Sequence, residues 1–350
     1  MSLEGVVAEN TGETVDAAVE VAVVGGGPTG ALAALCAADA GWRTALIAPD
    51  AADDPRTTAL LMPAIELMES LGVWQGAQDA AAPLVTMRLI DVTGRLPRAP
   101  EVAFDAHEAG LEEFGFNVPN DALNAAFAER LQDANVLRID TAATSIVPGK
   151  PALIGIQTQT IAADLIVAAD GANSMVRRDC GFSVRRWNYD QAAFVTTLSH
   201  ERPHSDTSTE FHTAAGPFTL VPLPGDRSSL VWVGRPDEVA RWASLPPGPL
   251  AREIEARAHN ILGRMRVDGP RGTIALEGVV AHRFGRDNVV LVGEAGHRFP
   301  PIGAQGLNLG MRDCAVLYRL LAEARADRSL RGVADAYDRR RRFDVNARTV

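Results

Sequence analysis

Residues 19–30 read Val-Glu-Val-Ala-Val-Val-Gly-Gly-Gly-Pro-Thr-Gly. The apolar first half is typical of a buried parallel strand, and an Ala- and Leu-rich helix is expected over residues 28–40. The glycines follow the G-x-G-x-x-G spacing, which permits a tight turn, close helix packing and the approach of a pyrophosphate to backbone N–H groups. With a second strand expected over residues 44–47, the pattern indicates a dinucleotide-binding unit. A glycine-rich turn without a ligand is the alternative.

The expected second strand lacks the acidic residue that the dinucleotide-binding pattern places at its end. Ala48 occupies that position, and the nearest carboxylate belongs to Asp50. An acid there holds a pair of ribose hydroxyls, and a simple NAD dehydrogenase depends on it for its choice of cofactor. A larger dinucleotide site has other anchors, so we expect Asp50 to take the place of the missing acid.

The composition excludes several classes of protein. The chain has 350 residues and is 47% hydrophobic, which is enough for a substantial core in one or two domains. A formal net charge of −10 argues against nucleic-acid binding, which needs clustered Lys and Arg. Cys36, Cys180 and Cys314 lie far apart without C-x-x-C spacing, so the sequence predicts neither a disulfide framework nor a metal site. A reducing, cytoplasmic setting fits this cysteine usage.

The sequence shows no sign of a membrane-spanning segment. Residues 1–18 contain four acids and no basic region followed by an apolar stretch, so we expect a disordered tail and no signal peptide. No apolar run reaches the ~20 residues that span a bilayer. The basic run over residues 339–342 is interpreted as a solvated helix terminus, with contact to anionic lipid as the alternative. Membrane contact is therefore expected to be peripheral at most, at the inner face.

Hydrophobic periodicity divides the rest of the chain into helical and β-rich stretches. Helices are expected over residues 57–71, 120–134, 249–262 and 306–321. Asn120 or Asp121 can cap the second of them. Strands are expected over residues 136–139, 164–168, 194–198, 218–221, 230–233 and 289–292. Short β-like runs within residues 85–116 indicate an antiparallel excursion from the first sheet.

This alternation predicts an α/β fold in which a Rossmann-like nucleotide-binding domain is interleaved with an antiparallel β-sheet domain. We expect the nucleotide-binding domain to be discontinuous, over residues 19–84, 117–186 and 281–350. The second domain is expected over residues 85–116 and 187–280.

Two further motifs follow apolar strands. Asp170-Gly171 comes directly after a strand and precedes Arg177, a pattern that can clamp ribityl and pyrophosphate groups or be loop geometry alone. Residues 293–310 read Gly-Glu-Ala-Gly-His-Arg-Phe-Pro-Pro-Ile-Gly-Ala-Gln-Gly-Leu-Asn-Leu-Gly and form the most specific motif. Glu294 can hold a ribityl hydroxyl, and the Gly- and Pro-rich loop can lay N–H groups and a helix N-terminus beside a flat ring. His297 is interpreted as structural, with a general base as the alternative.

Together these motifs resemble the aromatic-ring flavin monooxygenases of the para-hydroxybenzoate hydroxylase fold, and within them the ubiquinone-biosynthesis hydroxylase family. The resemblance covers nearly the whole chain and extends to residues 56–60, 71–74, 207–212 and 216–224. The chain departs from the family in the missing acid of the second strand. It also has Glu294 where the family usually has Asp; glutamate is one methylene longer than aspartate and carries the same charge.

The resemblance implies a reaction. NADPH or NADH would reduce bound FAD, O2 would add to the flavin as a C4a-hydroperoxide, and this species would transfer one oxygen atom to an electron-rich ring. The substrate would be a hydrophobic phenol or quinone precursor, a prenylated intermediate of ubiquinone biosynthesis, and other proteins of that pathway are the suggested partners. The protein would mainly orient the ring and exclude water. A reductase or dehydrogenase of the same fold and a non-catalytic nucleotide-binding scaffold are the alternatives.

The resemblance also assigns site residues. Those expected to bind FAD are Gly25, Gly27, Pro28, Thr29, Gly30, Asp50, Arg56, Thr57, Asn120, Asp170, Gly171, Arg177, Gly293, Glu294, Gly306, Leu307 and Asn308. Those expected along the reactive edge of the flavin are Pro300, Pro301 and Gly303. Those expected on the substrate side are His212, Phe218 and Pro222. Phe218 suits a core position equally well, and helix capping explains Asn120 equally well.

Overall fold

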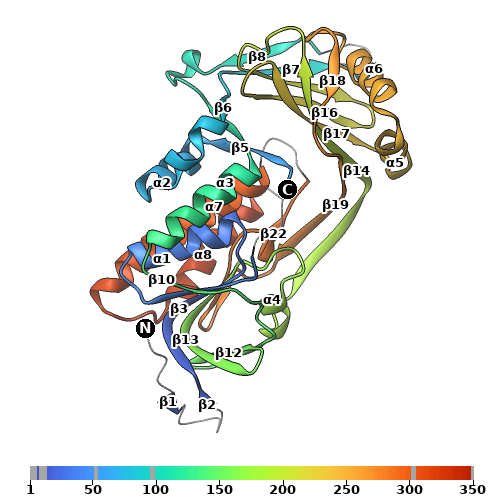
Figure 1. Ribbon diagram of the computed structural model, residues 1–350. Helices are drawn as coiled ribbons and strands as arrows, with labels where there is room; N and C mark the ends of the chain where they lie inside the picture. The colour runs from blue at the N-terminus through green and yellow to red at the C-terminus, as the bar shows by residue number, and fades with distance from the viewer. Residues whose placement is uncertain (1–5, 8–13, 51–53, 95–98, 301–304, 348–350) are drawn as a thin grey trace.

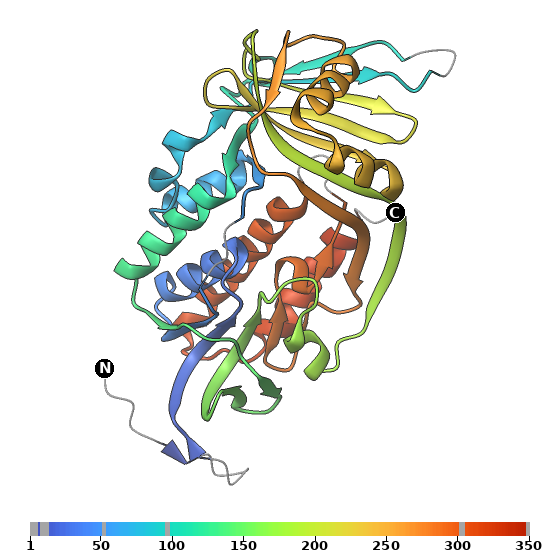
Figure 2. The same cartoon turned by 45° about the vertical axis from the view of Figure 1, so that its right-hand side comes forward.

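The computed structural model describes residues 6–7, 14–50, 54–94, 99–300 and 305–347. Figure 1 shows a larger part, in which helices lie against one sheet, and a smaller part built on a second sheet. Two long strands, β14 (Val184–His200) and β19 (Gly272–Ala281), join the two parts along one side of the molecule (Figure 2). This is the interleaved α/β architecture that the sequence predicts.

The first sheet has eight strands in the described part of the chain. They are β3 (Ala17–Val24), β4 (Thr44–Ile47), β10 (Val136–Ile139), β11 (Ser145–Val147), β12 (Ala152–Ile156), β13 (Gln159–Ala168), β20 (Gly285–Arg286) and β21 (Val289–Leu291). The strands β10, β4, β3, β13 and β21 pair in parallel. Their carboxyl ends therefore meet at one edge, outside which open α/β sheets bind their ligands.

Helices pack against this sheet and against one another. They are α1 (Pro28–Asp39), α3 (Asn120–Asp133), α7 (Gln305–Ala326) and α8 (Val333–Asn346). α1 contacts both α3 and α7, and α7 contacts α8. Residues 30–37 of α1 are buried on all sides. The Gly, Ala, Leu and Cys side chains of this stretch permit that burial, because none of them carries a charge that would need a partner.

The second sheet has nine strands among the described residues. Besides β14 and β19 these are β7 (Thr86–Asp91), β8 (Val102–Asp105), β15 (Thr207–Thr213), β16 (Gly216–Leu223), β17 (Arg227–Gly234), β18 (Met265–Val267) and β22 (His297–Arg298). Two helices, α5 (Pro236–Ser244) and α6 (Pro247–Arg257), cover one face and enclose a core that contains Trp232 and Trp242. β7 and β8 come from the expected excursion over residues 85–116, whereas the exact domain boundaries stay a prediction.

A small third sheet lies between the two parts. Its strands are β5 (Thr57–Leu61), β6 (Ala82–Pro83) and β9 (Gly115–Pro119). The remaining short elements are β1 (Val6–Val7), β2 (Thr14–Val15), α2 (Met62–Ser70), α4 (Met175–Asp179), η1 (Trp74–Gly76), η2 (Gln78–Ala80), η3 (His107–Ala109) and η4 (Gly293–Ala295). β9 contacts β16 of the second sheet, so this sheet connects the two larger ones.

The expected helix over residues 57–71 is partly wrong. Its first five residues form β5, which pairs with β9, and α2 begins only at Met62. Pro63 explains this start, because proline suits the first turn of a helix and has no N–H to give to a strand ladder. The apolar spacing from Leu60 onward did not distinguish a strand end from a helix.

Other helix ends also differ from expectation, among them those of α6 and α3. α6 ends at Arg257, because His259 and Asn260 adopt left-handed φ values of 50° and 53° that close the helix. α3 has Pro119 as its N-cap, so neither Asn120 nor Asp121 takes the predicted capping position.

The amino terminus also differs from the expected disordered tail. β1 pairs with β2 in antiparallel fashion, and β3 begins at Ala17. Residues 1–5 and 8–13 lie outside the described part of the chain.

Candidate functional site

The three glycines of the G-x-G-x-x-G spacing have different surroundings. Gly25 has a φ of 112°, and a Cβ there would lie 2.3 Å from the carbonyl oxygen of Ala169. A Cβ on Gly30 would lie 1.9 Å from the carbonyl oxygen of Gly25. Gly27 is the N-cap of α1, is exposed, and has no atom within 4 Å of its would-be Cβ. The loop is therefore tightly packed against the protein at Gly25 and Gly30. It is open to a ligand at Gly27, just before Pro28 and Thr29 begin the helix.

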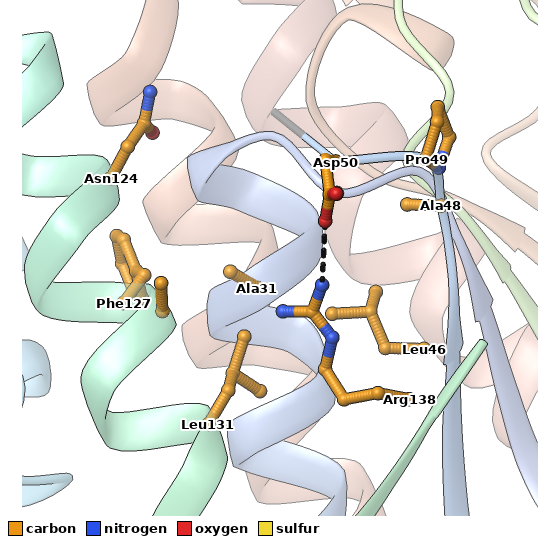
Figure 3. A pocket seen from close by; sticks show the side chains of 11 residues that line it. Ala31, Leu46, Ala48, Pro49, Asp50, Asn124, Phe127, Leu131 and Arg138 are labelled. Atoms are coloured by element: carbon orange, nitrogen blue, oxygen red, sulfur yellow. Dashed lines mark ion pairs between the residues drawn. The ribbon is translucent and has the colours of Figure 1, made fainter. Parts of the chain in front are cut away.

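A cavity of about 110 Å³ lies beside this loop, where β4 ends. Its lining residues are Gly26, Ala31, Leu46, Ala48, Pro49, Asp50, Asn124, Phe127, Ala128, Leu131 and Arg138. Figure 3 shows Asp50 and Arg138 pointing toward one another, with 3.9 Å between Oδ1 and Nη2. Asp50 is thus near the position of the missing acid. Arg138 is a polar residue of the cavity lining that no sequence motif indicated. Its guanidinium also donates a hydrogen bond to Asp140 at 2.8 Å.

Arg56 belongs to a hydrogen-bonded cluster at the start of β5. Its guanidinium donates to both carboxylate oxygens of Asp54, each at 2.6 Å. Asn120 donates to Asp54 at 2.8 Å and accepts a hydrogen bond from Thr58 at 2.6 Å. Burial alone would raise the pKa of Asp54, but the hydrogen bonds from Arg56 and Asn120 outweigh it and hold the pKa below its ordinary value. The side chains of Arg56 and Asn120 are therefore engaged with the protein; the predicted Thr57 pairs with Pro119 in the ladder.

Glu294 links this cluster to the third motif. The hydrogen bonds from Arg56 to Asp54 are the main reason that the pKa of Arg56 is raised, and the negative charge of Glu294 adds to the effect. The Glu294 side chain is 52% exposed and lies 3.8 Å from Arg298. It is the least enclosed part of the turn that follows β21, as a group that receives a ligand hydroxyl should be.

Asn308 in the first turn of α7 has a side-chain role that the sequence did not show. Its Oδ1 accepts the N–H of Leu61 at 2.9 Å, and its Nδ2 donates to the carbonyl of Ala59 at 2.7 Å. The amide thus holds β5 against α7. Beside it, Gly306 has open space at its would-be Cβ, and Leu307 packs against the large core.

Asp170 and Arg177 have different environments. One Asp170 oxygen accepts the N–H groups of Met175 and Val176 at 2.7 and 3.1 Å, and the other is buried without a hydrogen-bond partner among the described residues. Gly171 leaves open space beside it. Arg177 is buried and donates to the carbonyls of Ala295 and Ala172 at 2.8 and 2.6 Å. Burial lowers the pKa of Arg177. Arg177 therefore supports the turn at Gly293, and its direct contact with a cofactor stays a prediction.

The flavin-edge prediction is only partly placed. Pro300 is half-buried after β22, whereas Pro301 and Gly303 lie outside the described residues. His297 has the structural environment that the sequence favours: its Nε2 lies 2.7 Å from Asp313 and its ring stacks on Phe299.

The substrate-side predictions separate onto two faces of the second sheet. Phe218 is fully buried beside Phe211 and Trp232 in the core under α5 and α6, which favours the core position over the substrate side, where its contact stays a prediction. His212, 53% exposed and 2.8 Å from Glu210, points to the other face, because side chains alternate along a strand.

The face of the second sheet that carries His212 also touches the third sheet. Asn117 of β9 donates to the carbonyl of Pro222 at 2.8 Å and to Ser229 at 3.1 Å. Asn117 was absent from the predicted residues. The sign available in the sequence was an amide within the otherwise apolar Phe-Asn-Val-Pro stretch, because an amide that is buried in such a strand needs hydrogen-bond partners.

The described residues fit a bound dinucleotide. The open Gly27, the unpartnered oxygen of Asp170 and the exposed Glu294 follow β3, β13 and β21, which are neighbouring parallel strands. An acceptor oxygen buried without a partner is costly unless a ligand hydroxyl or ordered water completes it. The cavity beside Asp50 lies along the same edge of the sheet, at the end of β4.

Comparisons with known proteins identify the family of this chain. The family described as FAD binding domain matches residues 18–142 and 153–349. Ubiquinone hydroxylase UbiL of Rhodospirillum rubrum is 32% identical over 326 residues, which cover 88% of this chain and 73% of that protein. The 3-demethoxyubiquinol 3-hydroxylase of Escherichia coli is 31% identical over 327 residues, which cover 88% of this chain and 80% of that protein.

A solved structure shows the same fold. PqsL of Pseudomonas aeruginosa, described as a probable FAD-dependent monooxygenase, superimposes with a TM-score of 0.77 at 22% identity, over 94% of this chain and 93% of that one. The predicted fold, family and FAD cofactor are thereby confirmed. The chain belongs to the FAD-binding family of ubiquinone-biosynthesis hydroxylases and is an FAD-dependent aromatic-ring monooxygenase.

Proposed function

We propose that this monooxygenase hydroxylates the ring of a prenylated phenol, a quinone precursor of ubiquinone biosynthesis, with O2 and with NADPH or NADH as electron donor. The observation that carries the proposal is the similarity, over 88% of the chain, to proteins named ubiquinone hydroxylase and 3-demethoxyubiquinol 3-hydroxylase. Other proteins of that pathway are the partners that would deliver or receive such a substrate.

The cofactor placement follows the sheet edge. The pyrophosphate would lie against Gly27 and the N-terminus of α1, where N–H groups are unpaired. The adenosine would extend into the cavity between Asp50 and Arg138. The ribityl chain would pass Asp170 and Glu294, and the ring would end at the N-terminus of α7 beside Gly306.

Bound FAD would supply the oxygen chemistry, accepting a hydride from the nicotinamide and transferring one atom of O2 to the ring while the other leaves as water. The protein's own residues bind, orient and enclose. Asp170 and Glu294 would accept hydrogen bonds from hydroxyl groups of the ribityl chain, and the N-terminus of α7 would stabilise negative charge on the ring by about 0.3–1 kcal/mol. Glu210 and His212 would offer a phenol an acceptor and a donor from the facing sheet, since both side chains lie on that face, where that of His212 is 53% exposed and that of Glu210 is 18% exposed. Enclosure between the sheets would limit water at the ring.

A hydrophobic substrate bears on the cellular setting. None of the helices in the described part of the chain combines the length and the apolar character that a bilayer crossing requires. We place the enzyme in the cytoplasm with peripheral contact at the inner face of the membrane, because a prenylated phenol partitions into lipid.

The test is a cycle of reduction and reoxidation. The purified protein is loaded with FAD and titrated anaerobically with NADPH and, separately, with NADH. Air and a short-chain prenylphenol are then added, and the products are analysed by mass spectrometry. Bleaching of the flavin, its return, and a phenol heavier by one oxygen are the expected results.

Two other results would change the assignment. Bleaching without an oxygenated product from a panel of prenylphenols would favour the reductase or dehydrogenase alternative. A protein that takes up no FAD would refute the cofactor site altogether.

A further inference from the structure

A buried ionic cluster lies directly under the turn that carries Glu294. Asp313 on α7 and Arg341 on α8 have side chains that are 0% and 1% exposed. Arg341 Nε lies 2.5 Å from Asp313 Oδ1. The other carboxylate oxygen, Oδ2, accepts the N–H of Gly293 at 2.8 Å and lies 2.7 Å from His297 Nε2. One carboxylate thus holds both ends of the segment from Gly293 to His297.

A second buried charge holds the same segment from the other side. Arg177 of α4 donates to the carbonyl of Ala295 at 2.8 Å. Gly293 adopts a left-handed φ of 58°, so the chain turns between the contact with Asp313 and the contact with Arg177. Glu294 is the residue that projects outward there, with 52% of its side chain exposed. A carboxylate and a guanidinium therefore fix the backbone on each side of the residue that faces solvent.

The turn also packs against the first glycine loop without spare room. A Cβ on Gly293 would lie 3.1 Å from Thr29, and one on Gly310 would lie 2.7 Å from the Thr29 hydroxyl. A shift of the turn would consequently reach the N-terminus of α1. The same carboxylate of Asp313 thereby constrains both proposed binding segments.

We infer that Asp313 is a positioning residue of the flavin site, which sets the direction of Glu294 and is itself held in place by Arg341. The inference rests on the proposed path of the ribityl chain past Glu294. Burial alone would lower the pKa of Arg341, but attraction to Asp313 raises it above its ordinary value, so the guanidinium stays charged. Asp313 itself touches no substrate and acts only through the turn.

The experiment compares two buried carboxylates. Asp313→Asn keeps the size of the side chain and removes its charge. Asp338→Asn is the matched control, because Asp338 on α8 is equally buried and accepts a backbone N–H, that of Phe284, at 2.7 Å. The control is stringent, because the ring centroids of Phe284 and His297 lie 6.1 Å apart. A general loss of packing in this core would therefore disturb the turn in both variants. FAD affinity is measured by fluorescence titration, and the melting temperature of the FAD-free protein is measured alongside.

We expect both substitutions to lower the melting temperature, and only Asp313→Asn to weaken FAD binding. A hydrogen bond to a charged group contributes about 1.5–3 kcal/mol, which corresponds to a roughly ten- to hundredfold rise in Kd. Equal FAD affinities of the two variants would overturn the inference. Failure of the wild-type protein to bind FAD would instead refute the proposed function, so the two failures are distinguishable.

A double variant covers the case in which Asp313→Asn does not fold. Asp313→Leu with Arg341→Met replaces the ion pair by apolar groups, and such replacements often preserve stability. The turn still lacks its acceptor, so we expect near-normal melting with weak FAD binding. Recovery of FAD affinity together with stability would show that Asp313 is only structural.

Discussion

Alanine at two glycines of the first loop separates ligand contact from folding. Gly27→Ala adds a methyl group with no protein atom within 4 Å, at a φ of −66° that alanine adopts readily. Gly30→Ala adds the same methyl group 1.9 Å from the carbonyl oxygen of Gly25. The two changes are chemically identical and three residues apart, so their difference reports the surroundings of each Cβ.

The structure sets the expected magnitudes. For Gly27→Ala, the gain from a stiffer unfolded chain, about 0.4–1 kcal/mol, is offset by the poorer N-cap, and the net change in stability should be close to zero. If the pyrophosphate lies where proposed, the methyl group meets it, and overpacking of about 1–3 kcal/mol raises the Kd for FAD roughly 5- to 150-fold. For Gly30→Ala the overlap is with backbone that cannot move away, so we expect a loss of about 3 kcal/mol or more of folding free energy.

The assay measures both quantities on both variants. Urea unfolding of the FAD-free protein gives stability, and quenching of flavin fluorescence on titration gives the Kd. Gly27→Ala with wild-type FAD affinity would refute the placement of the pyrophosphate. Gly30→Ala with wild-type stability would refute the geometry of the loop itself.

Further predictions concern side chains. Glu294→Gln keeps the acceptor carbonyl but loses the charge, and should weaken FAD binding by about tenfold in the same titration while leaving the melting temperature unchanged, since the side chain is exposed. Phe218→Ala should cost about 3–5 kcal/mol in urea unfolding without changing FAD affinity, whereas His212→Ala should leave stability intact and raise the KM for the phenol. The reverse pattern would return Phe218 to the site. The pKa of Asp54 is depressed in the folded protein, so its ion pair with Arg56 stabilises the fold fully above the ordinary pKa of 3.8. This stabilisation is lost as the pH falls through the lower pKa of the folded state. Asp54→Asn should therefore weaken the dependence of the melting temperature on pH in that acid range.

Local patterns predicted the parts of the fold that depend on neighbours in sequence. The first strand, glycine loop and α1 follow from residues 19–39 alone, because alternation of composition and glycine spacing are local properties. The strand β5 did not follow, since its conformation depends on β9 and on Asn308, almost 250 residues away. The roles of Arg177 and Asn308 were likewise hidden, because their partners are backbone atoms of distant segments.

Arg341 shows where a tertiary contact did leave a mark in the sequence. It sits in a run of four arginines, and the run was interpreted as a solvated helix terminus, which is wrong for Arg341. The buried residues Ala334, Tyr337, Arg341 and Val345 recur at helical spacing, so Arg341 occupies the inward stripe of α8. A cation on such a stripe requires a buried anion, since an isolated charge in a core is too costly. Asp313, between Leu309 and Leu317 on the inward stripe of α7, meets that requirement. Opposite charges on two apolar stripes thus predict a helix pair, and here the pair supports the turn that carries Glu294.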